Sequence, residues 1–292
     1  MSLAAVTTRS EHRFAQVNGL RMHYVEAGAG EPVILLHGFP ECWYSWRNQI
    51  EALSPNYRAV APDLRGYHET EARGPYDTDT LQGDVLGLIQ TLGERSAHIV
   101  GHDWGGAIAW LLAIHHPEAV RSLAICNIPH PALFRAGLRS FAQLRRSWYL
   151  AFFQLPWLPE RLLAAGGYRR LAQTLFRRLP PSTERRDAMA YLVESWRQHG
   201  LTGPINWYRA LLRHPRPLPD PVPIITAPTT MIWGEDDPAL GKDLTLGTER
   251  YVRDLELHYL PETGHFVQQE APARVNELLL AHLAAVNGGR RG

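Results

Sequence analysis

Six short apolar runs, many of them separated by segments with helical periodicity, constrain the fold of this chain more than any other feature. The runs cover residues 32–39, 57–64, 97–103, 120–127, 228–235 and 255–261. Residues 78–93 show the intervening pattern, with Leu81, Val85, Leu88 and Leu92 on one face of a helix. An alternation of buried strands and helices predicts a mostly parallel, doubly wound α/β sheet that is covered on both faces.

The alternation stops at residue 130. Residues 131–217 show helical periodicity without a convincing strand, and residues 214–228 then supply six prolines, which exclude a helix there. We therefore expect a helical cap, residues 131–217, inserted into an α/β core that is formed by residues 1–130 and 218–292.

Composition and charge narrow the class of protein. The 292 residues are 45% hydrophobic and carry a formal net charge of +1, which suits a sizeable core and argues against a nucleic-acid binder. No apolar run is long enough for a membrane span, and the N-terminus lacks the apolar stretch of a secretory signal, so we expect a cytoplasmic protein. Two cysteines are too few for a disulfide framework or a cysteine-based metal site.

The charge is unevenly distributed along the chain. Residues 131–217 contain 15 Arg and 4 Asp or Glu, a balance of +11. The simpler interpretation is a solvated basic face that pairs in part with the rest of the protein. The alternative is a surface that attracts anionic substrates or anionic surfaces.

The segment IVGHDWGGAIAW, residues 99–110, has the outline of the strand-to-helix turn G-x-S-x-G, but Asp103 takes the place of serine. Gly101, Gly105 and Gly106 allow the close backbone approach that such a turn needs. A carboxylate that attacks a saturated carbon forms an alkyl ester, which water can cleave, whereas a serine would form a resistant ether. The motif therefore predicts displacement at saturated carbon followed by ester hydrolysis. The alternative is an inert aspartate at a helix N-terminus.

Two further residues complete the chain order of nucleophile, acid and histidine that accompanies this turn. Asp237 follows one apolar run, and His265 lies between the last run and the last helix. We predict that Asp103, Asp237 and His265 form a catalytic triad, and that Asp236 is a surface carboxylate.

The oxyanion hole of such a site needs only backbone donors. Residues 37–40, HGFP, follow another apolar run, and Trp104 follows the predicted nucleophile. The backbone N–H groups of Phe39 and Trp104 are therefore the predicted oxyanion hole, in which one donor is typically worth about 3 kcal/mol in the transition state.

Short motifs spread over nearly the whole chain carry a resemblance to a known family. They are HGFPECWYSWR (37–47), APDLRGY (61–67), GHDWGG (101–106), SWYLAFFQLP (147–156), NWYR (206–209), WGEDD (233–237) and TGH (263–265). Together they resemble the epoxide hydrolases of the α/β-hydrolase fold, which implies that fold with a helical cap inserted. The chain departs from the family at His68, Glu69 and Thr70, where similar proteins usually have glycine followed by aspartate or serine.

The resemblance implies that two tyrosines of the cap hydrogen-bond the epoxide oxygen. Matched to the family motifs, they are Tyr149 and Tyr208. Trp104, Phe153 and Trp207 are expected to line an apolar substrate pocket. The implied reactants are a small hydrophobic epoxide and water, with neither a metal nor an organic cofactor, and a homodimer is compatible with the sequence.

The sequence thus favours an epoxide hydrolase that forms a vicinal diol through an alkyl ester on Asp103. A haloalkane dehalogenase would use the same nucleophile, but that family usually has a halide-binding asparagine or second tryptophan, and Phe39 follows His-Gly here. A haloacid dehalogenase that acts on fluoroacetate typically has arginine where this chain has Trp104. A non-catalytic ligand receptor on a hydrolase fold is a further alternative, against which the complete triad argues. Asp103 also argues against an esterase.

Overall fold

The computed structural model describes residues 10–289, which form one eight-stranded sheet in the order β1-β2-β4-β3-β5-β6-β7-β8. The strands are β1 (Glu11–Val17), β2 (Leu20–Ala27), β3 (Pro32–Leu36), β4 (Arg58–Pro62), β5 (Ala97–His102), β6 (Val120–Cys126), β7 (Thr229–Gly234) and β8 (Leu255–Leu260). Strands β3 to β8 coincide with the six predicted apolar runs and pair in parallel. The predicted mostly parallel sheet is therefore confirmed.

An N-terminal hairpin, β1 and β2, adds two antiparallel strands that the sequence analysis did not predict. Most residues of β1 are exposed, because this strand lies at the edge of the sheet. Its sequence, EHRFAQV, mixes polar and apolar residues and so lacks the continuous apolar run by which strands covered on both faces are found.

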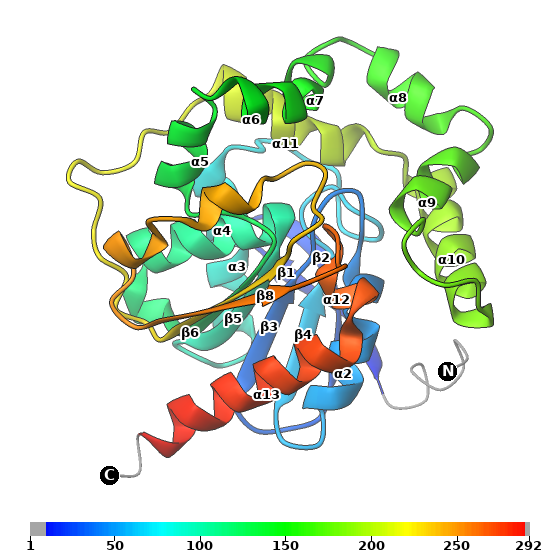
Figure 1. Ribbon diagram of the computed structural model, residues 1–292. Coiled ribbons are helices and arrows are strands. Elements are labelled where there is room, and N and C mark those ends of the chain that lie inside the picture. The colour runs from blue at the N-terminus through cyan, green and yellow to red at the C-terminus, as the bar shows by residue number, and fades with distance from the viewer. Residues whose placement is uncertain (1–9, 290–292) are drawn as a thin grey trace.

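Helices cover both faces of the sheet (Figure 1). Helices α3 (Thr78–Thr91) and α4 (Asp103–His115) lie on one face, and α2 (Arg47–Leu53) and α13 (Pro272–Gly288) lie on the other. Trp46, at the start of α2, Trp110, in α4, and Trp233, in β7, are fully buried, so the core fills both sides of the sheet. The shorter elements are α12 (Val267–Glu270), η1 (Trp43–Trp46), η2 (Pro117–Ala119), η3 (Lys242–Thr245) and η4 (Thr248–Arg250).

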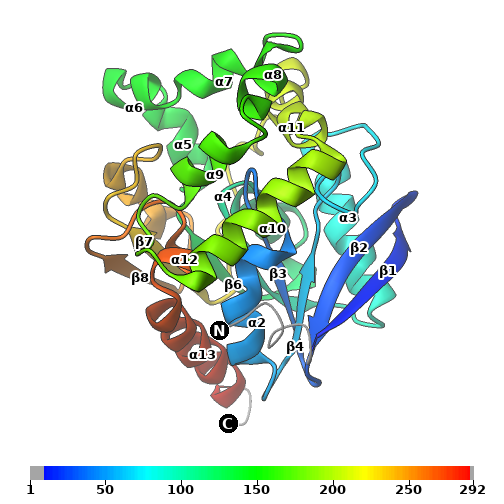
Figure 2. The same cartoon turned by 90° about the vertical axis from the view of Figure 1, so that its right-hand side faces the viewer.

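The chain between β6 and β7 forms the predicted helical insert. Its helices are α5 (Pro131–Gly137), α6 (Phe141–Arg146), α7 (Trp148–Phe152), α8 (Leu158–Ala164), α9 (Arg169–Leu175), α10 (Thr183–His199) and α11 (Thr202–Arg213). All of residues 131–217 are described, and none of them belongs to a strand. Figures 1 and 2 show these helices gathered on one side of the sheet. The division into a core domain and a cap domain stays a prediction, and residues 1–9 and 290–292 of that core lie outside the described residues.

Within residues 10–289, no helix combines the length and the apolar content that crossing a membrane requires.

The insert is seated on the core by a close contact between two glycine backbones. A Cβ atom on Gly203, in α11, would lie 2.3 Å from the carbonyl oxygen of Gly66 in the loop after β4. One turn later in α11, the indole N–H of Trp207 donates to the carbonyl of Arg65 at 2.9 Å. Only a residue without a side chain at position 203 lets the helix approach closely enough for this hydrogen bond.

Replacing Gly203 by alanine should therefore lower the stability of the protein. The methyl group meets backbone atoms that cannot move aside, and such overpacking typically costs about 1–3 kcal/mol. We expect a lower midpoint of thermal unfolding for Gly203→Ala. Gly288→Ala is the matched control, because a Cβ atom there meets nothing within 4 Å. Equal midpoints for both variants would contradict the close-contact account.

Candidate active site

A strained turn presents Asp103 at the junction of β5 and α4. Its backbone φ of +48° lies in the left-handed region, which residues other than glycine adopt rarely and mainly where the surroundings enforce it. A Cβ atom on Gly105 would lie 2.2 Å from the carbonyl oxygen of Leu36, and one on Gly101 would lie 2.6 Å from the Cα atom of Gly106. The glycines therefore permit the tight turn that projects the carboxylate beyond the end of β5.

The two oxygens of the Asp103 carboxylate have different partners. Oδ1 accepts a hydrogen bond from the backbone N–H of Phe39 at 2.9 Å, and Oδ2 lies 3.6 Å from Nε2 of His265. A Cβ atom on Gly38 would lie 2.5 Å from the Cβ atom of Asp103, so the loop after β3 reaches the carboxylate only because it has no side chain there. One oxygen is thus held by a backbone donor while the other faces the histidine.

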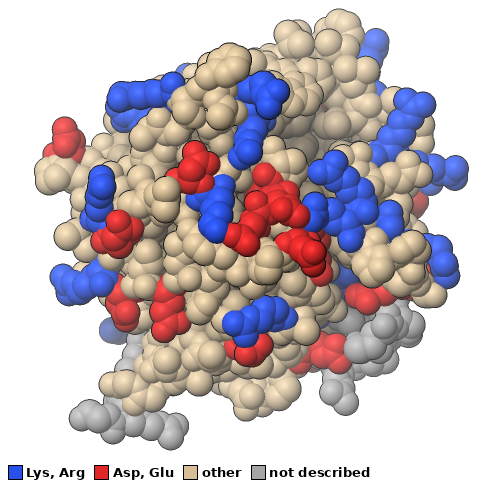
Figure 3. Space-filling model, viewed as in Figure 1, with Lys and Arg blue, Asp and Glu red and all other residues tan. Residues whose placement is uncertain are grey.

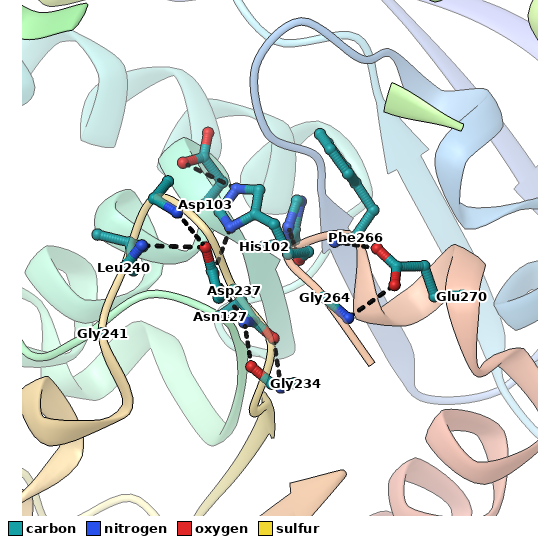
Figure 4. A network of polar contacts seen from close by, with 12 residues as sticks. His102, Asp103, Asn127, Gly234, Asp237, Leu240, Gly241, Gly264, Phe266 and Glu270 are labelled. Carbon is teal, nitrogen blue, oxygen red and sulfur yellow. Dashed lines mark hydrogen bonds and ion pairs between the residues drawn. The ribbon is translucent and has the colours of Figure 1, made fainter. Parts of the chain in front are cut away.

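Asp237 is held rigidly behind His265 (Figure 4). Its Oδ2 lies 2.6 Å from Nδ1 of His265 and accepts from the side-chain amide of Asn127 at 2.9 Å. Its Oδ1 accepts from the backbone N–H groups of Ala239 at 2.8 Å and Leu240 at 3.0 Å. Since every acceptor direction is occupied, the carboxylate can orient the imidazole ring.

The charges in this site support one another. Burial favours the neutral form of each group, yet the carboxylates of Asp237 and Asp103 raise the pKa of His265 well above its usual value. Burial also opposes ionisation of the two carboxylic acids, but the hydrogen bonds and positive charge of His265 hold the pKa of Asp103 and of Asp237 below the usual value. The free protein therefore holds an imidazolium between two carboxylates near neutral pH.

The loop that carries His265 is fixed by an acidic residue and by an arginine of the insert. Glu270 accepts from the backbone N–H groups of Gly264 at 2.6 Å and Phe266 at 3.2 Å, on either side of the histidine (Figure 4). Arg178, in the link between α9 and α10, binds Glu270 at 3.1 Å. A Cβ atom on Gly264 would lie 2.7 Å from Cδ of Arg178, so the arginine packs directly on this peptide.

Asp236, the neighbour of Asp237, lies outside the predicted triad. Its carboxylate is half-exposed and binds Arg178 at 2.7 Å. Two adjacent aspartates thus point to different partners, one to the buried imidazole and one to the arginine at the surface.

A second buried network lies beneath the triad and was missed by the sequence analysis. Nε2 of His102 donates to the backbone carbonyl of His265 at 2.8 Å, and its Nδ1 lies 3.2 Å from Glu41 and from Gln268. Because a carbonyl only accepts, Nε2 must carry a proton. The sequence signals were a histidine directly before the predicted nucleophile and a glutamate directly after HGFP.

Asn127 was missed as well. It follows β6 immediately, and carboxyl ends of parallel strands are where ligand sites form in α/β folds. Its side chain also pairs with both backbone groups of Gly234, which locks the end of β6 to the end of β7.

In the described part of the chain, two cavities of about 310 and 300 Å³ reach the Asp103 carboxylate. Both are lined by Asp103, Tyr149 and Tyr208, so the carboxylate and the two tyrosines of the insert share the walls of both cavities. The first is also lined by Trp104 and Trp207, and the second by Phe39, Phe153 and His265.

The tyrosines are packed among aromatic rings. The ring of Tyr208 lies 4.7 Å from Phe153, 5.1 Å from Trp104 and 5.9 Å from Tyr149, measured between centroids. Burial and the negative charge of Asp103 raise the pKa of both Tyr149 and Tyr208 above the usual value, so both hydroxyl groups keep their protons.

The structure thus brings together the side chains that the sequence analysis selected, from segments as far apart as residues 39 and 265. Their catalytic roles, and the donor role of the Trp104 N–H group, stay predictions. Among residues 10–289, no group of three or more His, Cys, Asp or Glu side chains is arranged to hold a metal ion.

Comparison with known proteins places this architecture in a family. Residues 31–272 match the family described as alpha/beta hydrolase fold. The chain belongs to this family. This α/β-hydrolase is 39% identical over 279 residues to the AB hydrolase superfamily protein YfhM of Bacillus subtilis. The aligned region covers 93% of this chain and 97% of that protein.

Other relatives of this α/β-hydrolase are epoxide hydrolases. It is 41% identical over 280 residues to human Epoxide hydrolase 4, with 91% of this chain and 76% of that protein covered. A solved structure of an epoxide hydrolase variant from Bacillus megaterium, complexed with its naphthyloxy-propanediol product, matches with a TM-score of 0.85 and 30% identity. That match covers 93% of this chain and 99% of the other.

The raised pKa of His265 gives a test of the site's electrostatics. Replacing Asp103 by asparagine removes one of the two charges that stabilise the imidazolium, so the pKa of His265 should fall. The pKa is measured by following the ring nitrogens of His265 in an NMR titration. Asp236→Asn, which removes an adjacent charge that binds Arg178 instead, should leave the titration of His265 unchanged. An unaltered pKa in Asp103→Asn would refute the charge pairing.

Proposed function

We propose that this α/β-hydrolase is an epoxide hydrolase, which adds water to an epoxide and releases a vicinal diol through an ester on Asp103. The observation that carries the proposal is a carboxylate at the turn where a hydroxyl is common, with two protonated tyrosines lining the same cavities. The similarity to epoxide hydrolases, one of them crystallised with a diol product, supports it. The cap, residues 131–217, supplies the tyrosines, and the core supplies the triad.

The first step opens the epoxide ring. Oδ2 of Asp103 attacks a ring carbon, and the bond between that carbon and the epoxide oxygen breaks. The oxygen leaves with the bonding electrons and takes a proton from Tyr149 or Tyr208, while the other tyrosine donates a hydrogen bond. Such acid assistance typically contributes about 10²–10⁴-fold to the rate.

The second step cleaves the ester. Ester formation removes the charge of Asp103, which lowers the pKa of His265. The imidazolium therefore gives its proton to the tyrosinate left by the first step and becomes the neutral ring that acts as base. Nε2 of His265 takes a proton from water, and the water oxygen bonds to Cγ of Asp103. The developing negative charge on Oδ1 is held by the N–H groups of Phe39 and Trp104.

Collapse of this intermediate completes the reaction. The bond between Cγ and Oδ2 breaks, and the released alkoxide takes the proton that His265 had accepted. The carboxylic acid of Asp103 then passes its proton to His265, so the imidazolium, the carboxylate and both tyrosines are restored and the diol is released. Asp237 keeps the ring of His265 in place throughout, because its oxygens are fixed by Asn127 and by backbone donors.

The cavities favour an apolar epoxide with substituents on both sides of the ring. One cavity extends from the Asp103 carboxylate along Leu111, Phe134 and Leu150, and the other extends toward Leu171 and Leu175. Since both meet at the tyrosines, a substrate bound there can occupy both while its oxygen contacts the hydroxyl groups.

One contact argues against the dehalogenase alternative. A halide site built from two tryptophans needs two free indole N–H groups. The indole N–H of Trp207 donates to the backbone carbonyl of Arg65 at 2.9 Å, so it is not free to bind a halide.

A single turnover in ¹⁸O-labelled water tests the ester route. With enzyme in excess over an aryl or alkyl epoxide, mass spectrometry should find the label in the peptide that contains Asp103. The label enters because the attacking water oxygen stays in the carboxylate when the diol leaves. Diol that carries the label while the peptide does not would overturn the covalent mechanism. Halide release from chlorinated or brominated alkanes without diol formation would favour the dehalogenase instead.

Removal of the tyrosine hydroxyl groups tests the acid role. Tyr208→Phe and Tyr149→Phe should each slow ester formation in pre-steady-state measurements by about 10²-fold, because the epoxide oxygen loses a proton donor. Hydrolysis of the ester should change little. Tyr168→Phe is the matched control, since this ring packs on Trp196 and not against the cavities. Unchanged ring opening in both variants would exclude the tyrosines as acids.

A further inference from the structure

The outer edge of the insert exposes an unusual number of large apolar side chains. This cap edge consists of residues 139–164, which include α6, α7, α8 and the links between them. Phe141 is 82% exposed, Trp148 64% and Trp157 60%. The remaining large apolar side chains exposed on the cap edge are Leu144, Leu155 and Leu162. Figures 1 and 2 both show α6, α7 and α8 along the side of the molecule farthest from α13.

The charge on the cap edge is almost entirely positive. Its arginines are Arg139, Arg145, Arg146 and Arg161, and Glu160 is its one acidic residue. Glu160 is already bound by Arg209 of α11 at 2.7 Å, so its charge is compensated within the insert. Figure 3 shows Lys and Arg side chains, in blue, amid uncharged surface along the top of this face, over the helices of the insert.

One arginine is combined directly with an aromatic ring. The guanidinium of Arg161 lies 4.9 Å from the centre of the Trp157 ring; Trp157 is the N-cap of α8, and Arg161 lies one turn later in that helix. The pair presents a cation and an apolar ring side by side at the surface.

Short helices with exposed tryptophan, phenylalanine and leucine beside arginine have the composition of segments that lie in the surface of an anionic bilayer. The aromatic and aliphatic groups enter the boundary of the acyl chains, and the arginines bind anionic headgroups. A second copy of this chain fits less well. A symmetric dimer through the cap edge would bring together two surfaces that both carry positive charge, which is unfavourable.

We propose that the cap edge docks on the surface of an anionic phospholipid bilayer. The docked helices would lie in the plane of the headgroups without crossing the bilayer. This assignment also gives a role to 4 of the 15 arginines of the insert, which the chemistry of the site does not use.

Docking would place the substrate cavity next to the lipid. Trp148 is exposed on α7, while the next residue, Tyr149, lines both cavities. The docking surface and the site therefore lie on different sides of the same short helix. Leu138 and Leu150, also from this part of the insert, line the first cavity. Resting on the proposed function, this geometry implies that the enzyme takes apolar epoxides that have partitioned into the bilayer.

Flotation of the full-length protein with vesicles tests the proposal. The probe vesicles contain equal parts of phosphatidylglycerol and phosphatidylcholine, and the comparison vesicles contain phosphatidylcholine alone. We expect at least about a tenfold higher bound fraction on the anionic vesicles, falling as salt is added because headgroup attraction is screened. Equal binding to both kinds of vesicle, or no binding to either, would overturn the proposal.

Two pairs of substitutions locate the surface. Trp148→Ser with Trp157→Ser, and Arg139→Glu with Arg145→Glu, should each abolish flotation. Leu246→Ser and Arg253→Glu are matched controls on the core, and Leu246 is 68% exposed. These controls should float like the natural protein. Loss of binding in the controls, or its retention in both pairs, would assign binding to another surface.

Two further readouts separate the remaining outcomes. Turnover of a water-soluble epoxide should stay within about twofold in all four variants, since none of the changed side chains lines the cavities. Vesicle binding without any epoxide turnover would sink the proposed function but not the docking surface. Light scattering that finds a dimer, dissociated by the tryptophan substitutions, would assign the cap edge to a second copy.

Discussion

A buried imidazole between two buried carboxylates is the interaction on which the rest of the site depends. Removing three ionised groups from water is costly unless each is paired and hydrogen-bonded. One positive charge on His265 offsets two negative charges on Asp103 and Asp237, so one negative charge is left over. Backbone N–H groups and the Asn127 amide point at the carboxylates and stabilise that remainder.

These donors come from loops that a parallel sheet brings to one edge. Phe39 follows β3, Asp103 follows β5, Asn127 follows β6, Asp237 follows β7 and His265 follows β8. These strands are successive neighbours in the sheet, and all of them run in the same direction. Their loops therefore meet at the carboxyl edge, where open α/β sheets bind ligands. The strained backbone of Asp103 is tolerated there because glycines let the neighbouring chain segments close around it.

The parts of this arrangement that follow from local pattern could be predicted from the sequence. Buried strands appear as continuous apolar runs, the turn at Asp103 has its own spacing of glycines, and Asp237 and His265 follow strands in the expected order. The sequence analysis did not predict the antiparallel hairpin, because an exposed edge strand has no such run. It did not predict the roles of Glu41 and Asn127 for another reason. Their partners are 61 and 110 residues away in the chain, so only the folded structure shows what they bind.

Arg178 makes the insert more than a cover for the cavity. It extends from the link between α9 and α10 to Glu270, the residue that fixes the backbone on both sides of His265. The position of the insert and the orientation of His265 are thereby joined through one guanidinium group. The two parts are consequently not interchangeable modules. In a chimaera that joins this core to the insert of a relative, the loop of His265 loses this support unless the insert also has an arginine at this place. Directed evolution of the insert for new substrates must likewise keep this arginine.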